Sequence, residues 1–194
     1  MVNIAINLKN LGSDTMLETK RLVLRPYQEG DLQEYFKILS DHKNMYYIDD
    51  IIVETLEEAR LSLQEAINLM LNGNARRFAI TIKGMLTHIG AVGYDISATT
   101  PIGRIGHMGW FVLPKYQNYG YITEATKRVL LYAFDDDNCI RITTGCYQEN
   151  IPTQKVITKV GFRQEAHKIK AQWHDGKMKD RLDYAINKDE FYSQ

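Results

Sequence analysis

The stretch PKYQNYGYITEA, residues 114–125, holds the residues best placed for binding chemistry. A proline ends an apolar run, polar and aromatic residues follow, and helix-forming residues begin directly after Gly120. A glycine at such a change from strand to helix lets a ligand approach the backbone. The first turn of a helix also carries unpaired N–H groups and the positive end of the helix dipole, which together bind anions. The stretch therefore predicts a site for a phosphate-bearing cofactor.

Two common nucleotide sites do not fit this stretch. A nucleoside triphosphate site requires a lysine and a hydroxyl residue after its glycines, whereas Gly120 is followed by tyrosine and isoleucine. A dinucleotide site requires spaced glycines in the turn between a strand and a helix. Gly103, Gly106 and Gly109 do recur at regular intervals, but they precede or lie within a strand, where glycine relieves crowding or forms a bulge. Neither kind of nucleotide site is predicted.

The elements that must position this site follow from the hydrophobic periodicity of the chain. Strands are predicted in KRLVLRP, RRFAITIK, THIGAVGYDIS, IGHMGWFVL, CIRITTGCY and a closing pair around HDGK. Helices are predicted in DLQEYFKIL, from TLEE onward, from about Tyr121 to Phe134, and in NIPTQKVITKVGF. In the helix after Gly120, apolar residues recur at three- and four-residue spacing and give one face that can pack on a sheet. This order predicts a mixed α/β sheet with helices on its faces.

Composition limits the partners of the site. The chain has 194 residues with 24 basic and 24 acidic side chains, so it lacks the net positive charge that attracts nucleic acid or anionic membranes. No apolar run is long enough to span a bilayer, and the N-terminus lacks a secretory signal. Cys139 and Cys146 lie at odd spacing in one strand and suit neither a short disulfide nor a metal clip. We expect a cytoplasmic protein with reduced cysteines and no metal, nucleic-acid or membrane partner.

The chain shows no repeat, low-complexity tract or flexible linker. Residues 1–15 are predicted to form an N-terminal extension and residues 16–194 a single domain. The acidic run Asp135, Asp136 and Asp137 is expected to be a solvated loop after the central helix.

Four segments resemble the GNAT acetyltransferases, and within them the RimJ/RimL group of ribosomal-protein N-terminal acetyltransferases. ETKRLVLRPYQEGDL resembles the first strand and helix of that group, and LPKYQNYGYITEA resembles its acetyl-CoA pyrophosphate loop, usually written Q/R-x-x-G-x-G/A. ENIPTQKVITKVGF resembles the cofactor-contacting helix, and WHDGKMKDRLDYAI the closing hairpin. The resemblance covers Leu17 to about Ile186. It implies the GNAT fold of the α/β (α+β) class, a mixed central sheet with a splayed strand pair and helices on both faces.

The resemblance implies that acetyl-CoA (coenzyme A) is the cofactor. Strand residues before the loop would pair with the pantetheine, and backbone N–H groups of the loop would hold the pyrophosphate. The residues implied are Phe111, Val112, Leu113, Gln117, Asn118, Tyr119, Gly120, Tyr121, Ile122 and Thr123. Asn150 suits a helix cap by its residue type, and the resemblance also makes its amide a pantetheine contact. Two positions depart from the motif, because Asn118 stands where the group often has glycine and Ile122 where it has a small residue.

The implied reaction is direct acetyl transfer to a primary amine, which must be neutral to attack, while the leaving thiolate needs a proton. Thr153 stands where RimL-like proteins carry a serine near the cofactor sulfur, and Ile157 replaces the tyrosine acid of many other members. Two glutamates of the family are absent, since this chain has Gln172 and His107 at their positions. His107 shares strand parity with Phe111 and is the candidate base; a histidine hydrogen-bonded within the sheet is the alternative.

The sequence leaves the acceptor amine open. In this fold, the segments DHKNMYYIDDII and AQWHDGKM would frame the acceptor cleft. Tyr46, Tyr47 and Trp173 could stack on a substrate and Asp49 or Asp50 could attract an amine, although surface loops often carry such residues without function. We expect a peptide N-terminal α-amine first and a small cationic amine, such as a polyamine or aminoglycoside, second. A non-catalytic acyl-CoA sensor is the alternative from another class, and the chain is expected to be a monomer or homodimer.

Overall fold

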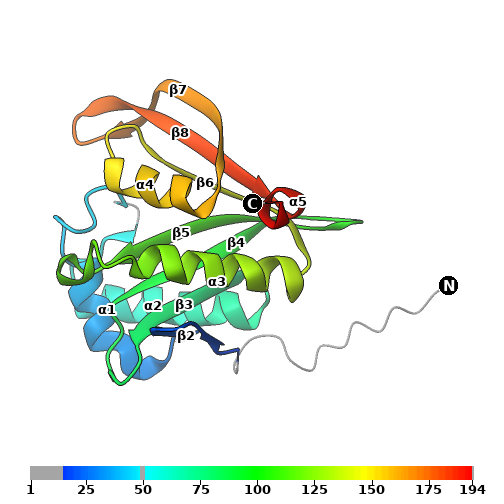
Figure 1. Cartoon of the computed structure of the whole chain (residues 1–194). Coiled ribbons are helices and arrows are strands. Elements are labelled where there is room, and N and C mark those ends of the chain that lie inside the picture. The colour runs from blue at the N-terminus through cyan, green and yellow to red at the C-terminus, as the bar shows by residue number, and fades with distance from the viewer. Residues whose placement is uncertain (1–14, 49–50, 194) are drawn as a thin grey trace.

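The computed structural model describes residues 15–48 and 51–193, which form one eight-stranded sheet flanked by helices (Figure 1). The strands are β1 (Leu17–Glu18), β2 (Leu22–Pro26), β3 (Ala75–Ile82), β4 (Gly90–Thr100), β5 (Gly103–Val112), β6 (Cys139–Tyr147), β7 (Arg163–His174) and β8 (Lys177–Asn187). Their order in the sheet is β1-β2-β3-β4-β5-β6-β8-β7. Residues 1–14 of the predicted extension, together with Asp49 and Asp50, lie outside the described residues.

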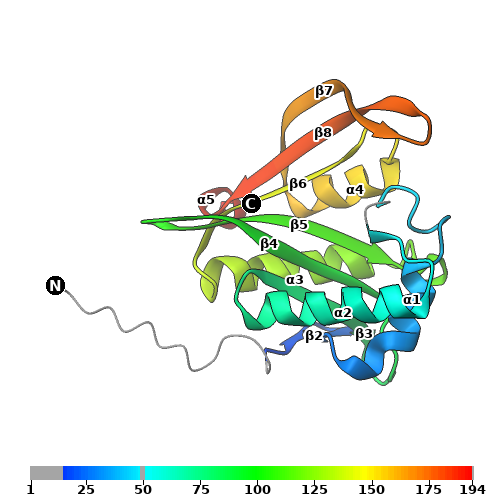
Figure 2. The same cartoon turned by 180° about the vertical axis from the view of Figure 1, so that it is seen from behind.

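Helices cover both faces of the sheet. Helices α1 (Leu32–Leu39) and α2 (Leu56–Leu71) lie on one face, and α3 (Tyr121–Asp135) and α4 (Ile151–Val160) on the other, as the two opposite views show (Figures 1 and 2). A short helix, α5 (Lys188–Tyr192), follows β8. The side chains of β3 alternate between the two faces of the sheet and so contribute to both hydrophobic cores. Phe78 and Ile80 pack with α3 on one face, whereas Ala79 packs with α1 and α2 on the other.

The sequence features that predicted α2 and α3 are confirmed in the structure. Thr55 precedes α2, and its side chain accepts a hydrogen bond from the backbone N–H of Glu58. In α3, the apolar residues with helical spacing are buried against the sheet; they are Ile122, Ala125, Val129 and Ala133. The first turn of α3 is therefore packed against the sheet.

Strands β5 and β6 splay apart, which confirms the predicted fold class. All neighbouring strands of the sheet are antiparallel except β5 and β6, which are parallel and are joined through α3. Their ladder starts at Arg104–Cys139 and ends at His107–Thr143. Beyond that pair, the facing edges of residues 108–112 and 144–147 diverge and leave main-chain groups open for another partner.

One aspartate of the predicted solvated run is buried, so that prediction is wrong for Asp137. Its side chain accepts hydrogen bonds from Arg76 at 2.8 Å, Arg104 at 2.7 Å and the Tyr94 hydroxyl at 2.8 Å. Arg76 is itself only 1% exposed, so its guanidinium and the Asp137 carboxylate each require the other as a buried counter-charge. The sequence shows a run of like charges, whereas the fold turns the last one inward to join α3 to β3, β4 and β5.

Cys139 and Cys146 are unpaired and buried, as expected for reduced cysteines. Burial raises the pKa of Cys139 to about 12 and that of Cys146 to about 11, which keeps both thiols protonated near neutral pH. No helix in the described part of the chain is long and apolar enough to cross a membrane.

Candidate active site

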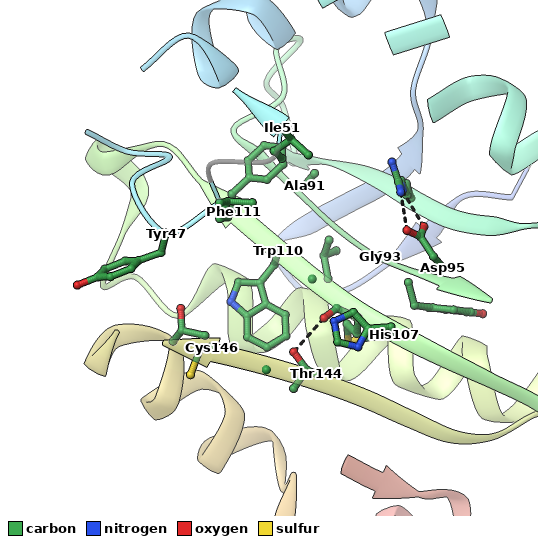
Figure 3. Close-up of a pocket in the computed structure, with 18 of the residues that line it drawn as sticks. Tyr47, Ile51, Ala91, Gly93, Asp95, His107, Trp110, Phe111, Thr144 and Cys146 are labelled. Atoms are coloured by element: carbon green, nitrogen blue, oxygen red, sulfur yellow. Dashed lines mark hydrogen bonds and ion pairs between the residues drawn. The ribbon is translucent and has the colours of Figure 1, made fainter. Parts of the chain in front are cut away.

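A cavity of about 400 Å³ opens where β5 and β6 diverge (Figure 3). One end is lined by Ser62 and Ala66 of α2, on the α1/α2 face of the sheet. The other end is lined by Asn150 and Thr153, at the start of α4 on the opposite face. The splay therefore makes an opening in the sheet through which groups bound from the two faces can meet.

Side chains control the width of this opening. The Thr144 hydroxyl donates a hydrogen bond of 2.9 Å to the carbonyl oxygen of Met108, just beyond the last main-chain pair of β5 and β6. The indole of Trp110 lies between the two diverging strands (Figure 3). The hydrogen bond keeps the two strands close at the start of the splay, and the indole occupies the space between them farther along.

The loop before α3 has the backbone shape of an anion site. Asn118 and Gly120 have φ values of +65° and +77°, the left-handed region that asparagine and glycine tolerate best. The first N–H inside α3 with a helical acceptor is that of Glu124, which donates to the Gly120 carbonyl. The N–H groups of Tyr121, Ile122 and Thr123 come before any helical acceptor and are available to a bound anion. The loop itself lies on the surface, outside the residues that line the cavity.

Arg21, which sequence reasoning missed, adds a positive charge beside this loop. Its Nη1 donates to the Tyr119 carbonyl at 2.9 Å, and its guanidinium lies 4.6 Å from the centroid of the Tyr121 ring. Its Nε bonds Glu124 at 2.7 Å. Burial alone would raise the pKa of Glu124, but hydrogen bonds from Thr19 and Arg21 outweigh it and lower that pKa. Glu124 thus anchors Arg21 next to the helix start.

His107 lines the cavity and is held by one ring nitrogen. Its Nδ1 lies 3.0 Å from the Thr143 hydroxyl oxygen, and that hydroxyl donates to the Gly106 carbonyl at 3.1 Å. Because the hydroxyl hydrogen is used by the carbonyl, Nδ1 carries the proton and Nε2 keeps its lone pair. Burial lowers the pKa of His107, and the positive charge of Arg181 lowers it further. The ring is therefore a neutral proton acceptor near pH 7 as well as a sheet hydrogen-bonding group.

The start of α4 brings the two polar residues predicted there to the cavity. Asn150 precedes the helix, and its side-chain oxygen accepts the N–H of Thr153 at 3.2 Å. This cap uses the oxygen of Asn150 and leaves its NH₂ group for another acceptor. Both residues line the cavity, whereas Ile157 is fully buried in the core.

The chain also matches a known protein family over most of its length. Residues 21–163 match the family model described as acetyltransferase (GNAT) domain. The chain belongs to the GNAT acetyltransferase family. An N-acetyltransferase of Bacillus subtilis, named YnaD and described as uncharacterized, is 32% identical over 178 residues, which is 90% of this chain and 98% of that protein.

Solved GNAT structures share the fold over most of the chain. A GNAT family acetyltransferase from Bacillus anthracis has a TM-score of 0.79 and 27% identity, and covers 90% of this chain and 99% of its own. RimL, named as a ribosomal L7/L12 alpha-N-protein acetyltransferase in complex with coenzyme A, has a TM-score of 0.79 and 18% identity, with 89% and 98% covered. This chain is a GNAT N-acetyltransferase, and it shares the fold of RimL.

The predicted cofactor residues of this GNAT site are only partly gathered around the cavity. Phe111 lines it, whereas the side chains of Leu113 and Ile122 are buried in the two cores. Only backbone groups of these two residues are open to a ligand. The burial of Ile122 explains how the loop accommodates this larger residue, because its side chain points away from the helix start.

The aromatic residues predicted for the acceptor separate into two sets. Tyr47 lines the cavity, and its ring lies 5.8 Å from that of Tyr147. Tyr46 does not line it; its ring packs 4.7 Å from His174 and its hydroxyl donates to Asp175 at 2.8 Å. Trp173 is 66% exposed and also lies outside the lining. The loop before α2 is thus tied to the β7–β8 hairpin, and Tyr47 alone of the three faces the cavity.

Most of the lining residues were not predicted from the sequence, and among them are Arg77, Asp95, Trp110 and Arg181. Arg77 binds Asp95 with two hydrogen bonds of 2.8 and 2.5 Å. Asp95 is the cross-strand partner of His107. His107 and Phe111 lie on the same face of β5, so an assigned β4–β5 register would have identified Asp95 as the partner of His107. Arg181 is distant in the sequence, and no local signal points to it.

Proposed function

We propose that this GNAT protein transfers the acetyl group of acetyl-CoA to the N-terminal α-amine of a protein or peptide by direct attack. The observation that carries the proposal is the cavity at the splay, which reaches both faces of the sheet. A donor bound along α3 and α4 and an acceptor bound along α2 can then meet without crossing the sheet. The named activity of RimL, a structural neighbour, supports a protein α-amine as the acceptor class.

The residues that would hold acetyl-CoA fit its chemistry. The N–H groups of residues 121–123 and the nearby guanidinium of Arg21 offer donors and positive charge to the pyrophosphate. The open edge of β5 around Phe111 and the NH₂ group of Asn150 offer hydrogen bonds to the amides of pantetheine. Bound acetyl-CoA supplies an activated thioester at the splay.

Two proton transfers are then required, one from the acceptor amine and one to the leaving thiolate. Nε2 of His107 accepts a proton from the acceptor ammonium, directly or through one water molecule. The attacking nitrogen gives up a second proton as it becomes an amide, and the Thr153 hydroxyl, at the donor end of the cavity, relays a proton to the departing thiolate. Backbone N–H groups near Val112 stabilise the developing charge on the thioester oxygen. Holding both substrates in one opening contributes much of the acceleration, up to roughly 7–11 kcal/mol in favourable intramolecular models.

The decisive experiment combines thiol release with product mass. Acetyl-CoA is incubated with short peptides, polyamines and aminoglycosides, free thiol is followed, and products are analysed by mass spectrometry. The proposal expects thiol release with peptides and one acetyl group on the α-amine. Acetyl-CoA binding without thiol release for every amine would support the sensor alternative instead, and transfer to polyamines alone would assign a small-amine acetyltransferase.

Replacing Thr153 with alanine is expected to reduce turnover more than acetyl-CoA affinity. A general acid contributes roughly 10²- to 10⁴-fold to rate, so kcat should fall within that range while the calorimetric Kd changes little. Thr153→Ser should restore most activity because it returns the hydroxyl. Thr158→Ala is the matched control, since the Thr158 hydroxyl bonds the Gln154 carbonyl on the same helix. A loss below about threefold would leave Thr153 a structural residue only.

Replacing His107 with glutamine is expected to lower turnover most at low pH. Because the folded pKa of His107 is lowered, the wild-type base stays neutral at about pH 6.5 and is lost only as pH falls further. The variant depends on spontaneous loss of the amine proton, so its activity should recover as pH rises toward the amine pKa of about 8. His167→Gln, on the exposed hairpin, is the control. Wild-type rates for His107→Gln at about pH 6.5 would remove it from the mechanism.

A further inference from the structure

Three glycines leave the floor of the cavity without side chains. Gly93 and Gly109 are cross-strand partners on β4 and β5, and Gly145 lies on β6 two positions beyond the last paired residue, as Gly109 does on β5. All three line the cavity. A Cβ atom added to Gly109 would meet no atom within 4 Å, so the space above that residue is open. We call these three residues the glycine trough.

An arginine stands at each end of the glycine trough. Arg77 on β3 is the cross-strand partner of Gly93, and its charge is balanced by the two hydrogen bonds to Asp95. At the other end, Arg181 of β8 lies over Gly145, where an added Cβ would come within 2.8 Å of its Nη2. The glycine trough is thus bounded by the Arg77–Asp95 ion pair at one end and by the guanidinium of Arg181 at the other.

The charge of Arg181 is only partly balanced. Its Nη1 donates to the neutral Gln172 side chain at 2.9 Å, and its Nε reaches Asp183 at 3.3 Å. Asp183 also pairs with Lys168 and does not line the cavity. Among the described lining residues that are charged near pH 7, two arginines face one aspartate, and Arg77 already holds that aspartate. The lining therefore carries a net positive charge next to the splay.

We propose that Arg181 binds a carboxylate of the acceptor, so that the preferred substrate is a peptide with an acidic first or second residue. This inference rests on the proposed peptide acetyltransferase activity and specifies its substrate class. The open space above Gly109, at the centre of the glycine trough, accommodates the start of the peptide, and Arg181 lies beside the opening where the amine must attack. A carboxylate near the α-amine reaches the guanidinium and gains charge-assisted hydrogen bonds. A polyamine would instead bring a second ammonium against the same positive charge.

The test compares peptides that differ in one charge. Hexapeptides with aspartate, asparagine or lysine at the first position, and a second set varied at the second position, are assayed with saturating acetyl-CoA. In at least one set, the aspartate peptide should have a kcat/KM at least about tenfold above that of its asparagine isostere. A factor of this size is what a hydrogen bond to a charged group typically contributes. The lysine peptide should be poorer still. The preference should shrink as salt rises, because the interaction is ionic.

Variants of the trough assign the preference to Arg181. Arg181→Gln should bring the aspartate-to-asparagine ratio close to one, and Arg181→Lys should retain part of it. Gly145→Ala keeps every charge but displaces the tip of Arg181, so it should also lower the ratio. Arg60→Gln is the control, because Arg60 is an exposed residue of α2 paired with Glu57. A ratio measured within one variant cancels differences in folding and in active fraction.

The outcomes separate this inference from the proposed function. Equal kcat/KM for the aspartate and asparagine peptides in the wild type would overturn the role of Arg181 and leave peptide acetylation standing. A preference that persists unchanged in Arg181→Gln would overturn it as well. Acetylation of none of the peptides would overturn the proposed function, and the inference with it.

Discussion

Replacing Gly120 with glutamate is expected to lower the affinity for acetyl-CoA by at least about 100-fold, a loss of about 2.7 kcal/mol. The reason is electrostatic, because a carboxylate would enter a helix start whose free N–H groups suit an anion. A Cβ atom at this position would lie 3.6 Å from Nη2 of Arg21, so the new carboxylate would also compete with phosphate for that guanidinium. Isothermal calorimetry with acetyl-CoA measures the effect.

Gly120→Ala is the matched control for this variant. Both substitutions place a side chain at a φ of +77°, which costs an L-residue about 1–2 kcal/mol in the folded state. Alanine adds this strain without a charge, so stability should fall in both variants while affinity falls steeply only with glutamate. Unchanged affinity in a folded Gly120→Glu protein, or an equal loss in both variants, would contradict an anion site at the start of α3.

Replacing Asp137 with alanine is expected to destabilise the fold by about 3–5 kcal/mol, the usual cost of removing one partner of a buried ion pair. The variant leaves Arg76 charged at 1% exposure and removes the hydrogen-bond acceptor of Tyr94. For a chain of this length, such a loss lowers Tm by roughly 6–20 °C. Thermal and urea unfolding measure it.

Asp136→Ala is the control, because Asp136 is the exposed neighbour in the same acidic run. It should change the free energy of unfolding by no more than about 0.5 kcal/mol. A small effect of Asp137→Ala, comparable to that of Asp136→Ala, would mean that the Arg76 charge finds another partner. The two variants together test whether the run is a solvated loop, as its composition indicates, or an internal brace.

The elements next to the proposed cofactor site were predictable because their signals are local. Gly120 marks the start of α3, Asn150 caps α4, and the spacing of apolar residues in α3 defines its buried face. Each signal involves residues within one or two turns of each other, so backbone preference and hydrophobic burial suffice to interpret it. The parity of His107 and Phe111 on β5 was predictable for the same reason.

The sequence by itself thus determined the order of the main elements, the glycine turn at the start of α3 and the family to which the chain belongs. Only the tertiary structure decided which charges meet. Arg181 lies over Gly145, Asp137 turns inward to Arg76, and Asp95 stands beside His107. These pairings join residues distant in the chain, and they depend on strand register and on the burial of each charge. Register depends on the hydrophobic patterns and turn geometries of several segments together, so no single short stretch of sequence encodes these pairings.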